Sequence, residues 1–437
     1  MNHSRLSISA VHKMRRRIIQ GTIQSPAESP AGPAANARHG GSNLQAQAKA
    51  SRAGGGFTIP LLIFLALLAG SQTNVAGEGL TKETEAGTTS NPEAPNFVEK
   101  LWDLPILYKN KKNPVVQQLA LVGRYHGQWH TTSSNTGEDR GWENRRARLG
   151  VKAKLFRYFE FETQFDLNLN EDEEEDFVED VDTLTLEFAA DKDFYIIAGK
   201  QKVKITDEFA TSSNKILTFE RSLLVNQIVP ERVGGVVVGK SFDSLFVEGG
   251  IYSGNLDEDL GFPELGGSYG FSLRCGYSLS RNSAVRLDYF HSGGGMDSEA
   301  FSPYRNIVSL NTNNKWDRWG FSGDLLAAEG AGNTPGVYGL VLMPYRDLTA
   351  NLRAVLRYHY AGSESSEGVT LQKRYERAAL TDGSGRRGRD YHSVYGGLNY
   401  HIHGDKLKLM SGLEYATMKG DADYSGWTVS AGCRLSF

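Results

Sequence analysis

The run from Arg146 to Leu155 alternates strictly between apolar and mostly cationic residues. One phase is Ala147, Leu149, Val151, Ala153 and Leu155, and the other is Arg146, Arg148, Gly150, Lys152 and Lys154. Because successive side chains of a strand point to opposite faces, the run predicts a strand with one apolar and one basic face. Such a strand suits the surface of a soluble sheet. It also suits the wall of a membrane barrel, where the apolar face meets lipid and the other lines an aqueous lumen.

Short alternating runs of this kind continue to the last of the 437 residues. They are bounded by polar and turn-forming residues, as antiparallel strands are. The sequence therefore predicts sixteen strands, near Val116–Trp129, Arg145–Leu155, Phe159–Asn168, Thr183–Ala189, Phe194–Val203, Val233–Ser241, Leu245–Ser253, Ser268–Ser280, Ala284–Ser292, Asn306–Asn313, Arg318–Glu329, Gly336–Met343, Leu348–Tyr360, Tyr391–His401, Lys406–Thr417 and Trp427–Phe437.

The connections between these strands alternate between short and long. The short ones are rich in Asn, Asp and Ser, as tight hairpin turns are: Arg157–Tyr158, Asp191–Asp193, Phe242–Ser244, Arg281–Ser283, Tyr345–Asp347 and Gly404–Asp405. The long ones are Asn135–Asn144, Asn170–Asp182, Lys204–Arg232, Gly254–Gly267, Gly293–Pro303, Ala361–Asp390 and Met418–Gly426, with a shorter one near Gly330–Pro335. Short turns at one end and long loops at the other are typical of outer-membrane barrels, which also have an even number of strands.

Composition supports this interpretation. The chain has 49 Gly, 20 Phe and 19 Tyr but 13 Pro, and no apolar run long enough to favour a helical membrane protein. Cys275 and Cys433 fall on the apolar phases of two strands, so we expect small lipid-facing side chains rather than a disulfide or a metal site. The predicted fold class is all-β: a transmembrane antiparallel β-barrel of about 16 strands.

The first 114 residues are expected to precede the barrel. Residues 1–56 carry eight Lys or Arg and one acid, a net charge of +7, and predict a basic low-complexity extension or a mis-assigned start. Phe57–Gly70 is a 14-residue apolar run with the length of a signal-peptide hydrophobic region. We therefore expect a signal and cleavage zone over residues 57–76, a polar leader over 77–114 and the barrel domain over 115–437.

Two stretches resemble the phosphate-selective porin O and P family of bacterial outer membranes. They are Asn144–Leu167 and Gly199–Lys240; the second contains Thr211–Ser213, Phe219–Ser222 and Val229–Pro230 in order. The resemblance implies a sixteen-stranded, usually trimeric barrel whose long segment after the fifth strand folds inward as a constriction loop. It also implies anion uptake along a ladder of arginines to a lysine-lined constriction. The terminal Phe437 resembles the signal read by the outer-membrane assembly machinery.

The strand phases assign a set of cations to the lumen. Those predicted to line the pore are Arg124, Arg146, Arg148, Lys152, Lys154, Lys200, Lys202, Arg353 and Arg357, and the same phase holds Arg274, Arg286, Lys406, Lys408 and Arg434. The candidate cations of the constriction loop are Lys204, Lys215, Arg221 and Arg232. A positive wall in a narrow aqueous pore favours the entry of anions, and guanidinium groups suit phosphate through paired donors.

Acids on the same lumen phase limit this prediction. Glu160, Glu162 and Asp166 lie on the strand beside Arg146–Leu155, where they can pair with its cations. The acidic run Glu171–Asp182 is assigned to an outer loop, and its spacing matches no calcium-binding template. The sequence contains no nucleophile motif, no Cys/His metal spacing and no phosphate-cradling glycine loop, so neither an enzyme nor a cofactor is predicted.

The leading hypothesis is an outer-membrane porin for passive diffusion of small solutes, with a preference for anions such as phosphate or polyphosphate. Its expected partners are small anions, outer-membrane lipid, the assembly machinery and two further copies of the chain. A general, weakly selective porin is the alternative within transport. A structural or adhesion barrel, with the acidic run and Arg386–Arg389 as its interaction surface, is the alternative from another class.

Overall fold

The computed structural model describes residues 101–169, 177–253, 268–293, 303–372, 374–380, 386–420 and 423–437. The expected basic extension (1–56), the signal zone (57–76) and the leader up to residue 100 lie outside the described residues. No helix among the described residues is both long and apolar enough to cross a membrane.

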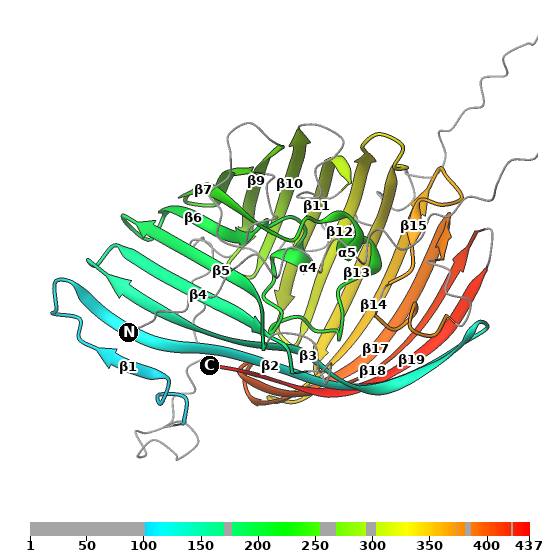
Figure 1. Cartoon of the computed structure of the whole chain (residues 1–437), viewed down its shortest axis with the longest axis horizontal. Helices are drawn as coiled ribbons and strands as arrows, with labels where there is room; N and C mark the ends of the chain where they lie inside the picture. Colours follow the sequence, from blue (N-terminus) through cyan, green and yellow to red (C-terminus); the bar gives the residue numbers. More distant parts are fainter. Residues whose placement is uncertain are drawn as a thin grey trace, which may run out of the picture. The chain divides into compact units, whose positions relative to one another are not determined.

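Sixteen antiparallel strands close into a barrel (Figure 1), which confirms the predicted fold class. They are β2 (Val116–Ser134), β3 (Gly137–Leu155), β4 (Phe159–Leu167), β5 (Val178–Ala189), β6 (Phe194–Lys202), β7 (Arg232–Phe242), β8 (Leu245–Ser253), β9 (Tyr269–Ser280), β10 (Ser283–Gly293), β11 (Tyr304–Trp316), β12 (Trp319–Gly330), β13 (Val337–Asp347), β14 (Leu352–Ser363), β17 (Asp390–His403), β18 (Leu407–Lys419) and β19 (Tyr424–Ser436). Each strand pairs with the next, and β19 closes the ring by pairing with β2 from Arg124 to Ser134.

The outward phase of the strands is apolar, as the alternation predicts. On β19 the side chains of Trp427 and Val429 are 51% and 42% exposed, whereas Thr428 and Ser430, which alternate with them, are buried on the interior side. Both cysteines are free thiols on this outward phase. A surface this apolar is compatible with lipid and not with water.

Two predicted connections differ in the structure. The expected loop Asn135–Asn144 is mostly strand, because β2 and β3 run on to Ser134 and Gly137 and leave a two-residue turn. This part of the hairpin is polar on both faces, so alternation gives no signal there. The expected turn Tyr345–Asp347 belongs to β13, and the chain turns at residues 348–351 instead.

Two segments fold into the barrel. The inner segment, residues 203–231, joins β6 to β7 and contains α4 (Asp207–Ala210) and α5 (Leu223–Ile228). Figure 1 shows both helices within the ring of strands, as the predicted inward-folded loop requires. The outer segment, residues 364–372 and 374–380, joins β14 towards β17 and includes β15 (Val369–Thr370), which pairs with β16 (Arg387–Gly388).

These segments give the barrel an apolar interior on one side. Leu224, Val225 and Ile228 of α5 are fully buried against inward side chains of β10 to β14, among them Phe290, Ile307 and Val341. Val369 and Leu371 of the outer segment join the same core. The water-accessible part of the lumen therefore lies towards β2–β6, where the inward side chains are charged.

Candidate pore constriction

A β-bulge concentrates arginines on the inner face of β3. His126 of β2 pairs with Arg146, but the next residue, Gly127, pairs with Asn144, so Arg145 is the extra residue of β3. A bulge interrupts the alternation of side chains. Arg145 therefore joins Arg146 and Arg148 on the lumen side, where it contacts the inner segment. Strict alternation assigned Arg145 to the lipid face and missed it.

Arg145 connects this wall to the inner segment. Its guanidinium donates to both carboxylate oxygens of Glu220, at 2.5 and 3.1 Å. Burial opposes ionisation of Glu220, but the charge and hydrogen bonds of Arg145 outweigh it and lower the pKa of this carboxyl to about 2. Glu220 therefore carries its negative charge at any physiological pH and cancels one arginine.

Arg148 belongs to an ion-pair network across four strands, β3, β4, β5 and β7. It donates to Asp166 of β4 at 2.5 Å and 3.0 Å and lies 2.7 Å from Asp182 of β5. Arg232, at the start of β7, donates to the same Asp182 oxygen at 2.6 Å. Asp182 was expected in a solvated outer loop, yet it is a buried residue of β5, because β5 begins at Val178.

The two lysines of β3 are also paired with acids. Lys152 lies 2.5 Å from Glu160 and 3.2 Å from Glu162, and Lys154 lies 3.8 Å from Glu160. The register sets these contacts, because Lys152 and Lys154 lie directly opposite Glu162 and Glu160. Lys200 of β6 is paired in the same way with Asp180 of β5 at 2.9 Å.

Three of the cations predicted from the strands to line the pore lack a carboxylate partner among the described residues. Arg124 donates to the Ser213 hydroxyl at 2.7 Å, and Lys202 donates to the carbonyl oxygens of Phe209 and Thr211 at 2.6 and 3.3 Å. Arg146 forms no ion pair or hydrogen bond within the described residues, and its Nη1 is buried without a partner. No carboxylate of the described residues therefore pairs with its charge.

Arg221 of the inner segment joins Arg124, Lys202 and Arg146 in a ring of cations at the constriction. Its guanidinium donates to the carbonyl oxygens of Glu208 and Thr211 and lies 5.1 Å from the centre of the Phe209 ring. Burial lowers the pKa of Arg221 to about 10, which still leaves it protonated at neutral pH. Lys215 lies in the same segment, and Lys204 faces Glu248 at 3.7 Å.

Other predicted pore cations hold the inner segment in place. Arg357 is 1% exposed and contacts Glu208 at 3.2 Å and Glu414 at 3.0 Å. Arg434 donates to four carbonyl oxygens of the segment, and Lys408 donates to the carbonyl of Ile216. Arg353 pairs with Asp347 near the short-turn end. Arg357, Arg434 and Lys408 thus donate hydrogen bonds to backbone carbonyls of the inner segment, which lies inside the barrel and pairs with none of the described strands.

The outer segment reaches from β14 across the lumen side of β17–β19 to β2 and β3. Tyr375 forms a hydrogen bond with Gln128, and its ring centre lies 4.7 Å from that of His130. Arg374 pairs with Glu143, and Gln372 donates to the carbonyl of Arg221 at 3.0 Å. Sequence alone placed this segment in a long outer loop, with no signal that it folds inward.

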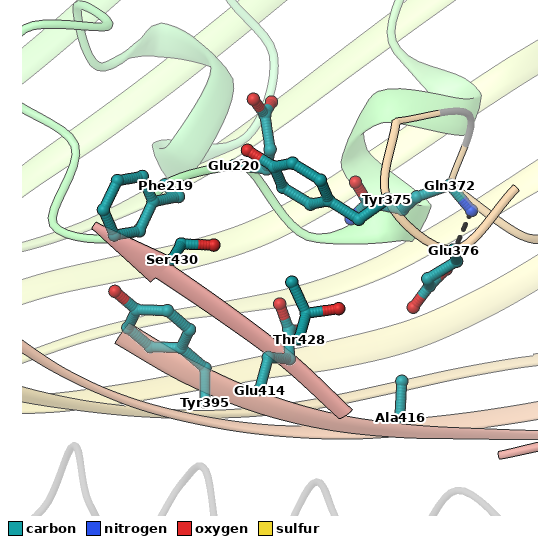
Figure 2. Close-up of a pocket in the computed structure, with 10 residues that line it drawn as sticks. All are labelled: Phe219, Glu220, Gln372, Tyr375, Glu376, Tyr395, Glu414, Ala416, Thr428 and Ser430. Carbon is teal, nitrogen blue, oxygen red and sulfur yellow. Dashed lines mark hydrogen bonds between the residues drawn. The ribbon is translucent and has the colours of Figure 1, made fainter. Parts of the chain in front are cut away.

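A small pocket lies where the two segments meet the wall. Figure 2 shows side chains of the inner segment, the outer segment and β17–β19 converging on it; they are Phe219, Glu220, Gln372, Tyr375, Glu376, Tyr395, Glu414, Ala416, Thr428 and Ser430. Glu376 accepts hydrogen bonds from the Tyr391 hydroxyl at 2.5 Å and from the backbone of Gln372 at 2.9 Å. Burial raises the pKa of Glu376 to about 7, so its charge changes in the physiological range.

Comparison with known proteins agrees with this geometry. The family model of the phosphate-selective porins O and P matches residues 122–262, which hold the bulge, the ion-pair network and the inner segment. This confirms the resemblance seen in the sequence. No curated protein matches the chain.

Solved structures support the fold. The outer membrane channel DcaP of Acinetobacter baumannii matches with 11% identity over 76% of this chain and 100% of its own, at a TM-score of 0.50. Salmonella typhi OmpF, solved in complex with daunomycin, matches with 12% identity over 75% of this chain and 99% of its own, also at 0.50. The sixteen-stranded fold and the match to this family model together support an outer-membrane porin of the bacterial cell.

Proposed function

We propose that this porin prefers anions and lets phosphate or polyphosphate diffuse passively through its constriction. The observation that carries the proposal is Arg146, whose guanidinium lies between Arg145 and Arg148 without a partner of its own in the described chain. Arg124 adds a further charge that only a neutral hydroxyl oxygen contacts. An excess of fixed positive charge in a narrow pore lowers the barrier for anions and raises it for cations.

The proposal places the selective charge differently from the sequence prediction. Arg146 and Arg124 retain the assigned role, together with Arg221, whereas Lys202 donates to backbone carbonyls of the inner segment. Lys152, Lys154 and Lys200 contribute less net charge because carboxylates neutralise them. Arg357 acts as a positioning residue for the inner segment rather than as a contact for solutes.

The acids near the ring favour one competing function. Asp166, Asp182 and Glu220 offset part of the arginine charge, which is what a general, weakly selective porin requires. An anion-preferring porin and a weakly selective porin therefore differ in how much positive charge remains at the constriction once the carboxylates are paired with arginines.

Reversal potential in a planar bilayer under a salt gradient decides between them. The reversal potential of the full protein should have the sign expected for a channel more permeable to anions than to cations, and phosphate should block chloride current. Arg146→Gln should reduce both effects, whereas Lys240→Gln, near a short turn beside Asp191, should change neither. A cation-preferring potential for the unaltered protein contradicts the proposal. A homotrimer, expected from the family resemblance, remains part of it and is tested by the mass of the detergent-solubilised protein.

A further inference from the structure

The segment that precedes the barrel forms a short strand that pairs with the first strand of the barrel. The short strand β1 (Ile106–Lys109) pairs antiparallel with Gln118–Ala120 of β2. The other edge of β2 at these residues is already paired with β3, so β1 lies on the edge that β19 uses further along. β19 ends where Phe437 exchanges backbone hydrogen bonds with Gly123, and β1 continues the wall beyond that point (Figure 1).

This strand presents an exposed apolar surface. Leu104 and Leu107 are 71% and 56% exposed, and Tyr108 is also exposed. The β3–β4 turn lies on the other side of β2 from this strand, where the backbone of Phe156 donates to the carbonyl of Val115, just before β2, at 2.8 Å. Phe156 is itself 55% exposed, as is its neighbour Tyr158 at 53%. The apolar surface is therefore continuous with the lipid-facing wall.

A rigid turn places cations beside these apolar groups. Lys109, Lys111 and Lys112 are exposed, and Arg157 follows Phe156 in the adjacent turn. Asn113 fixes the loop: its side-chain oxygen accepts from the backbones of Val115 and Val116, and its amide donates to the Tyr108 hydroxyl. The lysines thus lie on an ordered surface rather than on a free tail.

The charge of this surface is unlike that of the other short turns. No Asp or Glu occurs between Leu104 and Gly137 or between Asn144 and Phe159. Three other short turns mix signs, namely Asp191–Asp193, Asp317–Arg318 and Asp405–Lys406, whereas Phe242–Ser244 holds one acid and Arg281–Ser283 holds one cation. Short turns of outer-membrane barrels face the periplasm, so this basic surface lies at the level of the periplasm-facing leaflet.

We infer that the surface formed by Leu104–Val115 and the Phe156–Tyr158 turn binds anionic phospholipids of the periplasm-facing leaflet. Leu104, Leu107 and Phe156 contact the acyl-chain boundary, and the three lysines contact headgroup phosphates. Continuity with the lipid-facing wall selects lipid as the occupant, and the absence of acids selects an anionic headgroup. This inference rests on the outer-membrane location and not on the anion preference of the pore.

The test compares two variants of the full protein with matched charge changes. One carries Lys109→Gln, Lys111→Gln and Lys112→Gln; the control carries Lys192→Gln, Arg318→Gln and Lys406→Gln, three exposed cations of other short turns. Each protein is placed in nanodiscs of phosphatidylglycerol and phosphatidylethanolamine, and native mass spectrometry counts the lipids that remain bound. Heat-dependent electrophoretic mobility verifies that each barrel is folded.

The unaltered protein and the control should retain phosphatidylglycerol in excess over phosphatidylethanolamine. The lysine variant should lose most of that excess, on the order of a hundredfold for three phosphate-contacting lysines. Equal enrichment in the lysine variant and the unaltered protein would overturn the inference, even if the surface then captured a periplasmic protein. An equal loss in the control would also overturn it, since the effect would then be one of net charge. The reversal potential should stay unchanged in the lysine variant, so failure here leaves the pore proposal intact.

Discussion

Arg145 of β3 and Glu220 of the inner segment form a two-point ion pair, with Nε to Oε1 at 2.5 Å and Nη2 to Oε2 at 3.1 Å. The bulge that turns Arg145 inward makes this pair possible. One arginine is thereby used to fix the inner segment, while its neighbour Arg146 keeps an uncompensated charge. Two successive arginines of β3 therefore have different effects: Arg145 fixes the position of the constriction, and Arg146 gives it a positive charge.

Removing the charge of Glu220 should strengthen the anion preference. Glu220→Gln keeps the shape of the side chain and leaves Arg145 with an uncancelled charge. A single charge about 10 Å from the permeation path in water changes the permeability of one ion about twofold, and the anion-to-cation ratio about fourfold because the two ions respond in opposite directions. Reversal potential under a chloride gradient measures it. Glu138→Gln, in the polar part of the β2–β3 hairpin, is the control, and a shift towards cations in Glu220→Gln would contradict the charge assignment.

Replacing Lys152 and Lys154 together by Gln should weaken the anion preference through the acids that remain. Glu160 and Glu162 lose their partners and give the periplasmic mouth a net negative charge. Phosphate block of chloride current should nevertheless fall less than in Arg146→Gln, because the lysines contact carboxylates and the arginine does not. Block constants from single-channel recordings compare the two. A larger effect of the lysine pair would place the binding step at β3's periplasmic end instead.

Tyr375→Ala should enlarge the outer mouth of the pore. The substitution removes the hydrogen bond to Gln128 and the ring contact with His130 that tie the outer segment to β2. The segment then detaches from β2, and unit conductance rises. Tyr400→Ala, on the exposed outer face of β17, provides the control. An unchanged conductance would mean that the segment does not obstruct the path.

Docking of the outer segment should weaken as the pH rises from about 4.5 to about 7. Glu376 has an ordinary pKa of 4.5, and burial raises it to about 7. The docked form therefore holds a proton that the undocked form releases, so each step up in pH within this window favours undocking, and the effect levels off above it. The charged and titratable groups around the carboxyl are Glu414 of β18, Arg357 of β14 and Tyr391 of β17.

Conductance measured from pH 4 to 8 tests this linkage. It should rise through the window in the unaltered protein and stay flat in Glu376→Gln, which remains neutral. Persistence of the full pH dependence in Glu376→Gln would assign it to another group.

Gly150→Ala should destabilise the barrel. A Cβ at this position would lie 1.9 Å from the carbonyl oxygen of Thr163 and 2.8 Å from Cα of Gln164, both backbone atoms of β4. Overpacking of this kind costs about 1–3 kcal/mol of unfolding free energy. Urea unfolding followed by electrophoretic mobility measures it. Gly396→Ala is the control, since a Cβ there meets nothing within 4 Å.

Most of the barrel follows from alternation, and most of the site does not. Period-2 patterns locate the strands because each ring strand separates lipid from water. Alternation fails at Arg145, where the bulge adds a residue, and at residues 137–144, where both faces are polar. The pairing of Lys152 with Glu162 is predictable once the two strands are neighbours.

The contacts of the two inward segments require the tertiary structure. Tyr375 meets Gln128 across 247 positions of sequence, and Arg434 meets Ser213 across 221. No local pattern encodes such contacts. Asp182 joins the constriction for a similar reason, because the length of β5 rather than its composition brings it inside.

The inner segment also constrains the order in which the protein matures. It is fixed by Arg434 and Lys408 from the last two strands and by Arg124 and Arg145 from the first two. Those partners surround it only after β19 has joined β2. A folding intermediate in which β19 has not yet paired with β2 would therefore have most of its barrel strands but no ordered constriction. Ion selectivity would then be the last property that the folding chain acquires.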